Sequence, residues 1–385
     1  MSLSIAILTA EKREHDKDYT NPKPGFGAAP EALLQGFAQL PEVKLHVLSC
    51  VRQPVKAPEK ISDNIWYHSL VVPKIGWLRT GYQGCIRATR KKLQEIRPDI
   101  VHGQGTEHNN ALCAIFSGLP NVVTIHGNMA ALAQLFRARF GSYHWLTARL
   151  ENFALGWTAG VFCNSAYTES LVRPRARKTW RVPNPLRHEF FARLPDASRP
   201  AVLLNVGVIT ERKRQLELLD VAKTLHRHGL KFEFQFIGHL IPSDPYGAAF
   251  LERIKPLEAA GCARYLGEFG TSELIKRFDA AGALVHFPTE EAFGLVVAES
   301  MTRGLKFFGA RLGGISDIAK EVPGAELFDP ADWSGLTEAI AGWIRQGHPP
   351  LPDASAGLMS ERYHPEVIAR RHVEIYREVL GGNKS

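Results

Sequence analysis

The stretch that decides the fold lies at residues 287–300 and reads Phe-Pro-Thr-Glu-Glu-Ala-Phe-Gly-Leu-Val-Val-Ala-Glu-Ser. An apolar strand ends where it begins, a turn containing glycine follows, and a helical pattern starts near Leu295. The first N–H groups of a helix lack internal acceptors, and the helix macrodipole is positive there. We therefore expect the backbone N–H groups of Phe293, Gly294 and Leu295 to favour a phosphate.

Two glutamates, Glu291 and Glu299, lie on either side of this turn. If the helix begins after Glu291, Glu299 lies just over one turn into it, so both carboxylates can face one elongated ligand at different points. Glutamates on a helix are usually solvated surface, and we interpret Glu290 in that way, as mostly solvent-facing. For the other two, the preceding strand and the glycine turn favour a site that holds a diphosphate and hydroxyl groups.

Short β-like runs alternate with helical patterns along the chain, which is typical of parallel sheets with crossover helices. The runs lie at residues 3–8, 45–49, 100–102, 122–126, 161–163, 202–208, 234–237, 283–287 and 306–308. A polar, proline-bearing stretch at 194–200 separates the two series. We predict an α/β protein with two Rossmann-like, doubly wound domains at 1–190 and 191–360 that face a cleft, and a helix at 361–385 that crosses back to the first domain.

Composition describes a soluble globular chain of about two domains, since 385 residues are 45% hydrophobic and 22% charged. Disorder and collagen-like repeats are excluded. The net charge of +8 is uneven: residues 1–190 hold 24 basic and 14 acidic side chains, and residues 191–385 hold 23 and 25. The first half is therefore expected to meet an anionic partner.

Cysteine usage and hydropathy bear on the compartment. The five cysteines are far apart, with no spacing that suggests zinc, so we expect a reduced, cytoplasmic setting. The apolar run 3–8 is short and followed by charged residues, which indicates a buried first strand rather than a signal peptide. No window approaches the ~20 apolar residues of a membrane-spanning helix. Any membrane contact is expected to be peripheral.

Glu-Ala-Phe-Gly-Leu-Val-Val-Ala-Glu, residues 291–299, resembles the Glu-x7-Glu signature of retaining glycosyltransferases with the GT-B fold, in particular glycosyltransferase family 4. Further segments resemble the family in the same order along nearly the whole chain. They are Phe26-Gly27, Thr124-Ile125-His126-Gly127, Val182-Pro183-Asn184-Pro185 with Phe190, Asn205-Val206-Gly207 with Glu211-Arg212-Lys213, and Gly313-Gly314-Ile315-Ser316-Asp317.

The resemblance implies roles for the matching residues of the second domain. Glu291 would hydrogen-bond hydroxyls of the donor sugar, and Glu299 would hold the ribose of the nucleotide. Arg212 and Lys213 would neutralise the diphosphate as it leaves, so no metal or other cofactor is expected. The family usually has arginine directly after the glycine at 207, where this chain has Val208. A solvated helix start is the alternative for Arg212 and Lys213.

In the first domain, the resemblance implies that His126 lines the donor-sugar pocket, where it would hydrogen-bond a hydroxyl or support positive charge near the anomeric carbon. A structural histidine is the alternative, and it is our interpretation of His102, His108 and His286. Gly27 would approach the donor, or would only serve a tight turn. The long polar excursion at 11–24 is expected to shape the acceptor side.

The resemblance as a whole implies a retaining, metal-independent glycosyltransferase that moves a sugar from a nucleotide sugar to an acceptor hydroxyl, in cell-envelope or exopolysaccharide synthesis. The acceptor would be a sugar, a small molecule or a lipid-linked intermediate. A same-fold nucleotide-sugar epimerase, a sugar-phosphate synthase and a catalytically inactive nucleotide-sugar-binding partner stay open as alternatives.

Two basic clusters in the first half have competing explanations. One comprises Arg87, Arg90, Lys91, Lys92 and Arg97, and the other Arg173, Arg175, Arg177, Lys178 and Arg181. A charge run is usually a solvated face, but cations near aromatic residues also suit anionic lipid head groups. No recognised nucleic-acid-binding module accompanies them, so a nucleic-acid partner is not expected.

Overall fold

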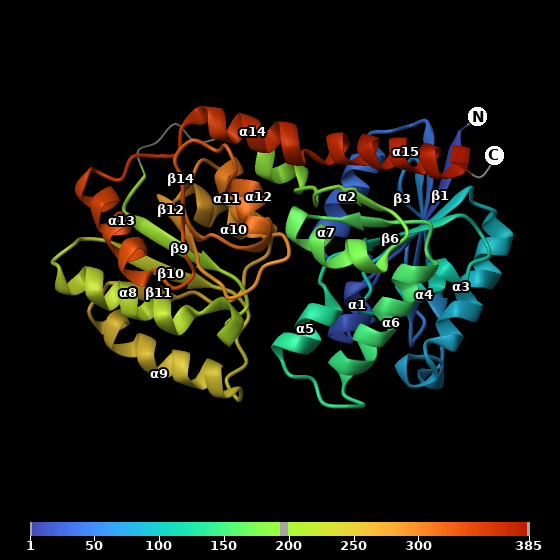
Figure 1. Cartoon of the computed structure of the whole chain (residues 1–385), viewed down its shortest axis with the longest axis horizontal. Coiled ribbons are helices and arrows are strands. Elements are labelled where there is room, and N and C mark those ends of the chain that lie inside the picture. The colour runs from blue at the N-terminus through green and yellow to red at the C-terminus, as the bar shows by residue number, and fades with distance from the viewer. Residues whose placement is uncertain (1, 193–198, 383–385) are drawn as a thin grey trace. The chain divides into compact units, whose positions relative to one another are not determined.

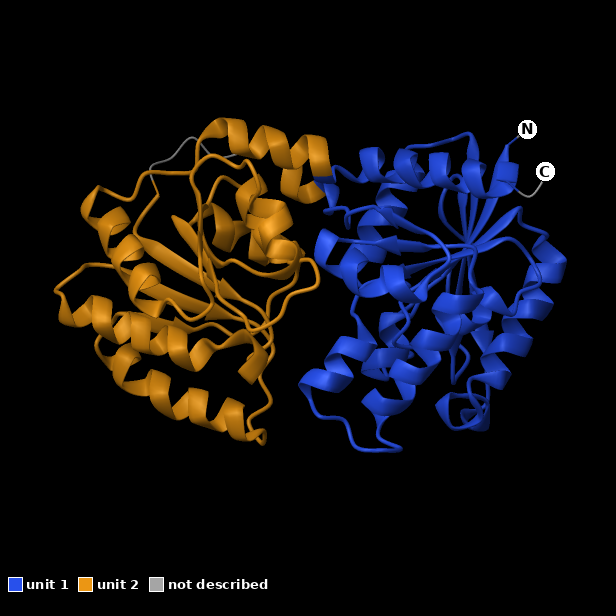
Figure 2. Ribbon diagram, in the orientation of Figure 1, with its two compact units in different colours: residues 1–188, 363–385 blue, residues 189–362 orange. Residues whose placement is uncertain are grey.

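The computed structural model describes residues 2–192 and 199–382, and it is a mixed α/β structure with two predominantly parallel sheets (Figure 1). The chain divides into two compact units (Figure 2). Unit 1 comprises residues 1–188 and 363–385, and unit 2 comprises residues 189–362. The predicted fold class is confirmed. Residues 194–198 of the expected linker lie outside the described residues.

Unit 1 contains an eight-stranded sheet with the order β3-β4-β2-β1-β5-β6-β7-β8, in which β3 is antiparallel to β4 and the other pairs are parallel. The strands are β1 (Leu3–Leu8), β2 (Val43–Val51), β3 (Lys60–Ser62), β4 (Ile65–Val71), β5 (Ile100–Gln104), β6 (Asn121–Ile125), β7 (Val161–Cys163) and β8 (Thr179–Arg181). From β1 the chain first moves outward to β2 and later returns to β5, so the point between β1 and β5 is a topological switch point.

The helices of unit 1 connect these strands. They are α1 (Lys12–Asp16), α2 (Ala28–Ala38), α3 (Gln83–Ile96), α4 (Asn110–Ile115), α5 (Met129–Leu135), α6 (Tyr143–Trp157), α7 (Ala166–Val172) and α15 (Pro365–Gly382), with short 3₁₀ turns η1 (Lys74–Gly76), η2 (Leu78–Thr80) and η3 (Arg173–Arg175). Both faces of the sheet are therefore covered, which explains why β5 is buried along its whole length.

The C-terminal helix α15 belongs to unit 1 and packs on α2. Gly36 permits this approach, because a Cβ there would collide with the carbonyl group of Pro365. Phe37 stacks on Tyr376, with 6.4 Å between ring centroids. The buried hydroxyl of Tyr376 lies 2.5 Å from Nδ1 of His102, which supports the structural role expected for that histidine.

Unit 2 contains a six-stranded parallel sheet with the order β11-β10-β9-β12-β13-β14. Its strands are β9 (Val202–Val206), β10 (Glu233–Ile237), β11 (Ala263–Tyr265), β12 (Ala283–His286), β13 (Lys306–Ala310) and β14 (Ala325–Phe328). β9 leads outward to β10 and β11, whereas β12 leads in the opposite direction to β13 and β14. The switch point of this sheet therefore lies between β9 and β12, which are hydrogen-bonded neighbours.

The helices of unit 2 are α8 (Gln215–Arg227), α9 (Pro245–Ala259), α10 (Thr271–Asp279), α11 (Leu295–Thr302), α12 (Gly313–Ala319), α13 (Trp333–Arg345) and α14 (Asp353–Tyr363), with 3₁₀ turns η4 (His188–Phe191) and η5 (Glu211–Lys213). The predicted helix start at Leu295 is confirmed. All nine predicted strands are present, and the edge strands β3, β8, β11 and β14 and the longer β4 were not predicted from the sequence.

Candidate active site

The turn that decides the fold connects β12 to α11 at the switch point of unit 2. Gly294 precedes α11 with φ of +100°, a conformation that favours glycine. The first hydrogen bond inside the helix runs from the N–H of Val297 to the carbonyl oxygen of Gly294, at 2.9 Å. The N–H group of Leu295 therefore lies at the positive end of the helix dipole, as the phosphate prediction requires.

The glycine pair at 313–314 holds this turn in place. The N–H of Gly314 donates to the carbonyl oxygen of Glu291 at 3.0 Å. A Cβ on Gly314 would lie 2.5 Å from the carbonyl oxygen of Phe293, and one on Gly313 would collide with the carbonyl of Glu291. The start of α12 thus approaches the turn as closely as two residues without side chains allow, which gives the Gly-Gly element a physical reason.

Glu291 lies at the centre of a buried charge cluster. Its Oε2 atom is 2.5 Å from Nζ of Lys213 and 3.1 Å from Nε2 of His286. The side chains of Lys213, Glu291 and His286 are 12%, 14% and 1% exposed. Lys213 follows β9 and Glu291 follows β12, so the neighbouring strands at the switch point bring together residues that are 78 positions apart.

The protonation states in this cluster follow from its contacts. Burial acts to raise the pKa of Glu291, but the charge of Lys213 and the hydrogen bond from His286 outweigh it and hold that pKa well below its usual range. Burial, and then the charge of Lys213, lower the pKa of His286. A neutral His286 donates from Nε2 to the carboxylate, and its buried Nδ1 has no hydrogen-bond partner among the described residues.

Arg212 and Glu290 form a second pair beside the first. Nη1 of Arg212 donates to the carbonyl oxygen of Glu290 at 2.9 Å and lies 3.3 Å from its Oε2. The expectation that Glu290 is mostly solvent-facing is wrong, because its side chain is only 15% exposed. Burial raises the pKa of Glu290, against the opposing charge of Arg212. Its packing against the η5 segment, which no local sequence pattern signals, accounts for the difference.

The other residues of the predicted donor site in unit 2 occupy the expected elements. Glu299 is the fifth residue of α11 and is 5% exposed. Phe293 is buried directly before Gly294. Val208, which stands where the family usually has arginine, is 47% exposed. The ligand contacts of Glu299, Arg212 and the α11 N–H groups stay predictions.

His126 and Gly27 belong to unit 1. His126 directly follows β6, and its Nε2 is 2.9 Å from Oε1 of Gln104. Burial lowers the pKa of His126 to about 4, although a hydrogen bond with Asn184 acts in the opposite direction. The imidazole is therefore neutral near pH 7, which favours hydrogen bonding to a hydroxyl over the support of positive charge. Asn184 belongs to the Pro-Asn element. Its hydrogen bond to His126 positions the imidazole ring.

Gly27 precedes α2 with φ of −62°, which any residue can adopt. A Cβ there would meet only Cδ of Pro30, at an ordinary contact of 3.7 Å. Neither backbone conformation nor internal packing demands glycine, so the tight-turn interpretation is not supported. The close approach of a ligand to Gly27 stays a prediction.

Two histidines interpreted as structural from the sequence lie at candidate functional positions. His286, the last residue of β12, contacts the carboxylate of Glu291, and its place directly before the turn was the available signal. His108 lines a cavity of unit 1.

Within residues 2–192 and 199–382, no group of three or more His, Cys, Asp or Glu side chains is arranged to hold a metal ion. None of the helices in these ranges combines the length and the apolar composition of a membrane span.

Solved structures share this architecture along the whole chain. Sucrose-phosphate synthase from Thermosynechococcus elongatus aligns with a TM-score of 0.77 and 16% identity, over 99% of this chain and 100% of the other. Anabaena HepE in complex with UDP and glucose aligns with a TM-score of 0.70 and 14% identity, over 98% and 100%. At these identities the likeness shows the fold alone, and that fold is the GT-B fold of glycosyltransferases.

Two family models match the chain in succession. The one described as Glycosyltransferase Family 4 matches residues 31–190, and the one described as Glycosyl transferases group 1 matches residues 187–354. The chain thus belongs to the GT-B glycosyltransferases of the family 4 type, as its motifs indicate.

Relatives of known function match shorter segments. N-acetyl-alpha-D-glucosaminyl L-malate synthase of Bacillus anthracis is 24% identical over 149 residues, which are 38% of either chain. D-inositol 3-phosphate glycosyltransferase of Corynebacterium urealyticum is 28% identical over 182 residues, which are 45% of this chain and 42% of the other. The matches span less than half the length of these relatives.

Proposed function

We propose that the protein is a retaining glycosyltransferase that moves a sugar from a nucleotide sugar to an acceptor hydroxyl. The observation that carries the proposal is the Lys213–Glu291 pair beside the start of α11, at the switch point where open α/β sheets bind ligands. The complexes of Anabaena HepE with UDP and with UDP-glucose support a nucleotide-sugar donor.

The geometry suggests how the pair divides its work. The ammonium group of Lys213 has three donors, of which Glu291 takes one, so the others are available to diphosphate oxygens. Glu291 stays ionised and acts as a hydrogen-bond acceptor for sugar hydroxyls, not as a proton donor. Its negative charge also stabilises positive charge that develops on the sugar ring.

The proposed transfer takes place in one displacement at the anomeric carbon, without a covalent enzyme intermediate. The bond from the anomeric carbon to the diphosphate oxygen breaks, and the bond from the acceptor oxygen to the anomeric carbon forms on the same face. The acceptor hydroxyl proton passes to an oxygen of the departing diphosphate. Lys213 and the N–H groups at the start of α11 stabilise that diphosphate most strongly as it leaves, so we propose that no metal ion is required.

A thermal-shift panel tests the donor site. We expect UDP, GDP or ADP, or one of their sugars, to raise the unfolding temperature, because a ligand at 100 times its Kd adds about 2.7 kcal/mol to the stability of the folded state. The shift should be the same in EDTA and in Mg²⁺, and the nucleoside monophosphate should give a smaller one. No shift with any nucleotide would contradict the donor site, and a shift that requires Mg²⁺ would contradict metal independence.

The alternatives make different products. An epimerase converts the nucleotide sugar without an acceptor, and a sugar-phosphate synthase requires a sugar phosphate as acceptor. An inactive partner binds the nucleotide sugar and releases nothing. Product analysis with and without added acceptors therefore separates the epimerase and the inactive partner from a transferase. A phosphorylated product would identify the synthase as a transferase with a sugar phosphate as its acceptor. The intact Glu291, Glu299 and Lys213 favour an active enzyme over an inactive partner.

We also propose that the enzyme works in the cytoplasm and contacts an anionic membrane peripherally. The five cysteines are free and buried, which suits a reducing compartment. Of the two basic clusters, the second is partly neutralised, because three carboxylates pair with four of its five cations. Arg173 and Arg181 pair with Glu169, Arg175 with Glu151, and Lys178 with Glu378. This cluster is therefore a poor lipid contact.

The end of α5, the start of α6 and the loop between them form a better surface. Leu135, Phe136, Phe140 and Tyr143 are 47%, 51%, 86% and 42% exposed, and we call them the α5–α6 aromatic surface. Residues 108–150 contain no Asp or Glu, but they include Arg137, Arg139 and Arg149. Exposed aromatic rings among cations complement an anionic bilayer. Glu107 is an acidic neighbour of this surface, because the hydroxyl of Tyr143 donates to its carbonyl oxygen at 3.0 Å.

Replacement of Phe140 by serine tests this surface. We expect binding to phosphatidylglycerol-containing vesicles to fall by about tenfold or more, because a buried Phe side chain contributes about 1.5–3 kcal/mol. Sedimentation with vesicles measures the loss. Ile241→Ser, which removes a side chain of unit 2 that is 52% exposed, is the matched control and should bind as the wild type does. Equal binding by Phe140→Ser and wild type would rule this surface out.

A further inference from the structure

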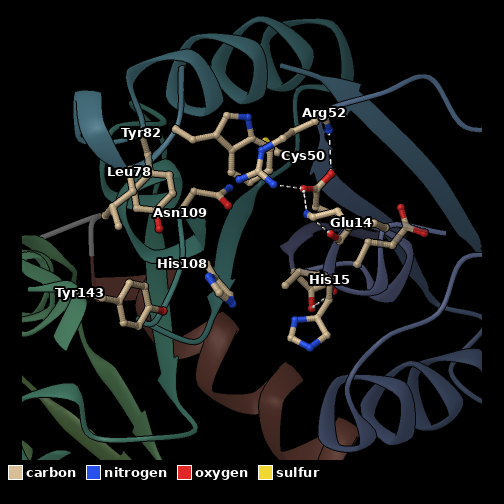
Figure 3. Close-up of a pocket in the computed structure, with 14 residues that line it drawn as sticks. Glu14, His15, Cys50, Arg52, Leu78, Tyr82, His108, Asn109 and Tyr143 are labelled. Carbon is tan, nitrogen blue, oxygen red and sulfur yellow. Dashed lines mark hydrogen bonds and ion pairs between the residues drawn. The ribbon is translucent and has the colours of Figure 1, made fainter. Parts of the chain in front are cut away.

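Unit 1 contains a cavity of about 250 Å³ at its own switch point, between the ends of β1 and β5 (Figure 3). Its walls come from the loop and short helix after β1, the end of β2, the segment from η1 to the start of α3, the loop after β5 and the start of α6. The polar side chains that matter are Glu14, Arg52, Tyr82, His108 and Asn109. The volume lies just below the ~300–1,000 Å³ of sites for drug-sized ligands, so the cavity fits a single small molecule or ring.

Two cations and one carboxylate determine the charge at one wall. Oε1 of Glu14 accepts from Nη1 of Arg52 at 2.6 Å and from Nζ of Lys17 at 2.7 Å. Oε2 accepts from the hydroxyl of Tyr19 and from the backbone N–H of Arg52, both at 2.8 Å. Burial acts to raise the pKa of Glu14, but these hydrogen bonds outweigh it and lower that pKa. Glu14 is therefore ionised and saturated, and one positive charge is left over.

The other acidic side chain at the cavity does not cancel this excess. Glu11 forms an ion pair with Arg13, and its Oε2 accepts from the hydroxyl of Tyr67 at 2.7 Å. The two carboxylates thus face three cations, Arg13, Lys17 and Arg52. The cavity suits a ligand that carries negative charge.

Arg52 is prepared for such a ligand. Its guanidinium carbon lies 4.4 Å from the ring centroid of Trp77, and Glu14 holds Nη1, so two contacts fix the plane of the group. Nη2 makes no hydrogen bond to any described residue, and Figure 3 shows the guanidinium facing the same open space as Asn109 and His108. A held guanidinium with an unused donor matches a carboxylate or phosphate oxygen.

The cavity also holds a side chain, Tyr82, that can hydrogen-bond to ligand hydroxyls. The ring of Tyr82 is buried, but its hydroxyl has no hydrogen-bond partner in the part of the chain that the structure describes. Burial raises the pKa of Tyr82, so the hydroxyl stays protonated and can donate or accept. The backbone of Tyr82 has φ of +62°, a left-handed conformation that is rare for an aromatic residue. Such a conformation persists only where the surrounding structure stabilises it. These features suit a ligand with hydroxyl groups.

We propose that this cavity takes the acceptor, and that the acceptor is a small polyhydroxylated molecule with a carboxylate or phosphate group held by Arg52. The proposal rests on the proposed transferase function and assigns its acceptor class. The anionic group lies against Arg52, and the hydroxyls lie against Tyr82, Asn109 and His108. The polar excursion at 11–24 contributes Glu11, Glu14, His15 and Lys17 to the lining, as the expectation that it shapes the acceptor side requires.

Binding of three soluble probes to the full chain tests the proposal: D-glucose, D-glucuronate and D-glucose 6-phosphate. Calorimetry should show the two anions binding at least tenfold more tightly than glucose. Arg52→Gln should bring the affinity for the two anions down to that for glucose, because a hydrogen bond to a charged group is lost. Arg79→Gln, at an exposed arginine of η2 outside the lining, is the matched control.

Two further measurements distinguish a lipid-borne anion from a free one, and a loss of binding from a failure of the variant to fold. Phosphatidylinositol vesicles, compared for wild type and Arg52→Gln, show whether a lipid head group supplies the anion. A loss confined to vesicles supports the lipid source, and a loss with soluble anions supports a free one. If Arg52→Gln does not fold, Tyr82→Phe takes its place as the test, because it removes only a hydroxyl. Tyr82→Phe should weaken the binding of all three sugars several-fold. Equal binding of both the soluble anions and the vesicles by wild type, Arg52→Gln and Tyr82→Phe would overturn the proposal.

The donor site is measured independently in the same samples. UDP should shift the unfolding temperature of Arg52→Gln as it shifts that of the wild type, because Lys213 and Glu291 lie in unit 2. Anion binding without any nucleotide binding would leave the cavity assignment intact and contradict the transferase function. Nucleotide binding without a preference for the anions would contradict the cavity assignment and leave the transferase function intact.

Discussion

Glu291→Gln should lower turnover by about two to three orders of magnitude while the protein stays folded. The substitution keeps the size of the side chain but removes the negative charge that lies 2.5 Å from Lys213 and 3.1 Å from His286. Lys213 would then lack its fixed counter-charge, and the sugar hydroxyls would lose a charged acceptor. Steady-state kinetics with the nucleotide sugar that the thermal-shift panel selects would measure the effect on kcat.

The neighbouring Glu290→Gln is the matched control. Glu290 has similar burial and an arginine partner, but its carboxylate faces Arg212 and not Lys213. We expect less than a tenfold change in kcat for this variant. Circular dichroism and the unfolding temperature should show that both variants are folded. Wild-type turnover in folded Glu291→Gln would refute the role of Glu291, and equal losses in both variants would point to the charge of the turn as a whole.

The sequence was a good guide to the central strands and to the turn at 287–300. Buried parallel strands are near-continuous apolar runs, and β1, β9 and β12 are of that kind, with one polar residue in each. The edge strands β8 and β11 have three residues each and include an arginine, so no apolar run marks them, whereas the three residues of β7 are all apolar and were predicted. β4 differs, because its seven residues include the aromatic and β-branched side chains that favour strands. The sequence contained a usable signal there.

The candidate site could be predicted only in part. Motif spacing identified Glu291 and Lys213, but their contact depends on which strands are neighbours, and the order β9-β12 is a property of the folded sheet. The engagement of Arg212 by Glu290 was hidden for the same reason. The cavity of unit 1 unites residues from five segments between Thr9 and Tyr143, and no local pattern indicates that they meet.

Arg303 holds the first residues of unit 2 against the core of that unit. Nε and Nη2 donate to Asp279 at 2.6–2.8 Å, and Nη1 donates to the carbonyl oxygens of Ala192 at 2.8 Å and Phe190 at 3.3 Å. The side chain is 3% exposed. Removal of this guanidinium leaves a carboxylate and two carbonyl oxygens without their donors, which is the costly way to break a buried ion pair.

Arg303→Met should therefore destabilise unit 2 by about 3 kcal/mol, at the low end for a buried pair because Asp279 is 25% exposed. Urea unfolding followed by tryptophan fluorescence would show a lower midpoint for the transition of unit 2. Arg253→Met is the control, since Arg253 and Asp220 are 44% and 61% exposed and such pairs contribute at most about 1 kcal/mol. If the two variants unfold at the same urea concentration, the Arg303 network does not stabilise unit 2. If only Arg303→Met is less stable, and its nucleotide shift persists below the new midpoint, the network supports the donor site through folding alone.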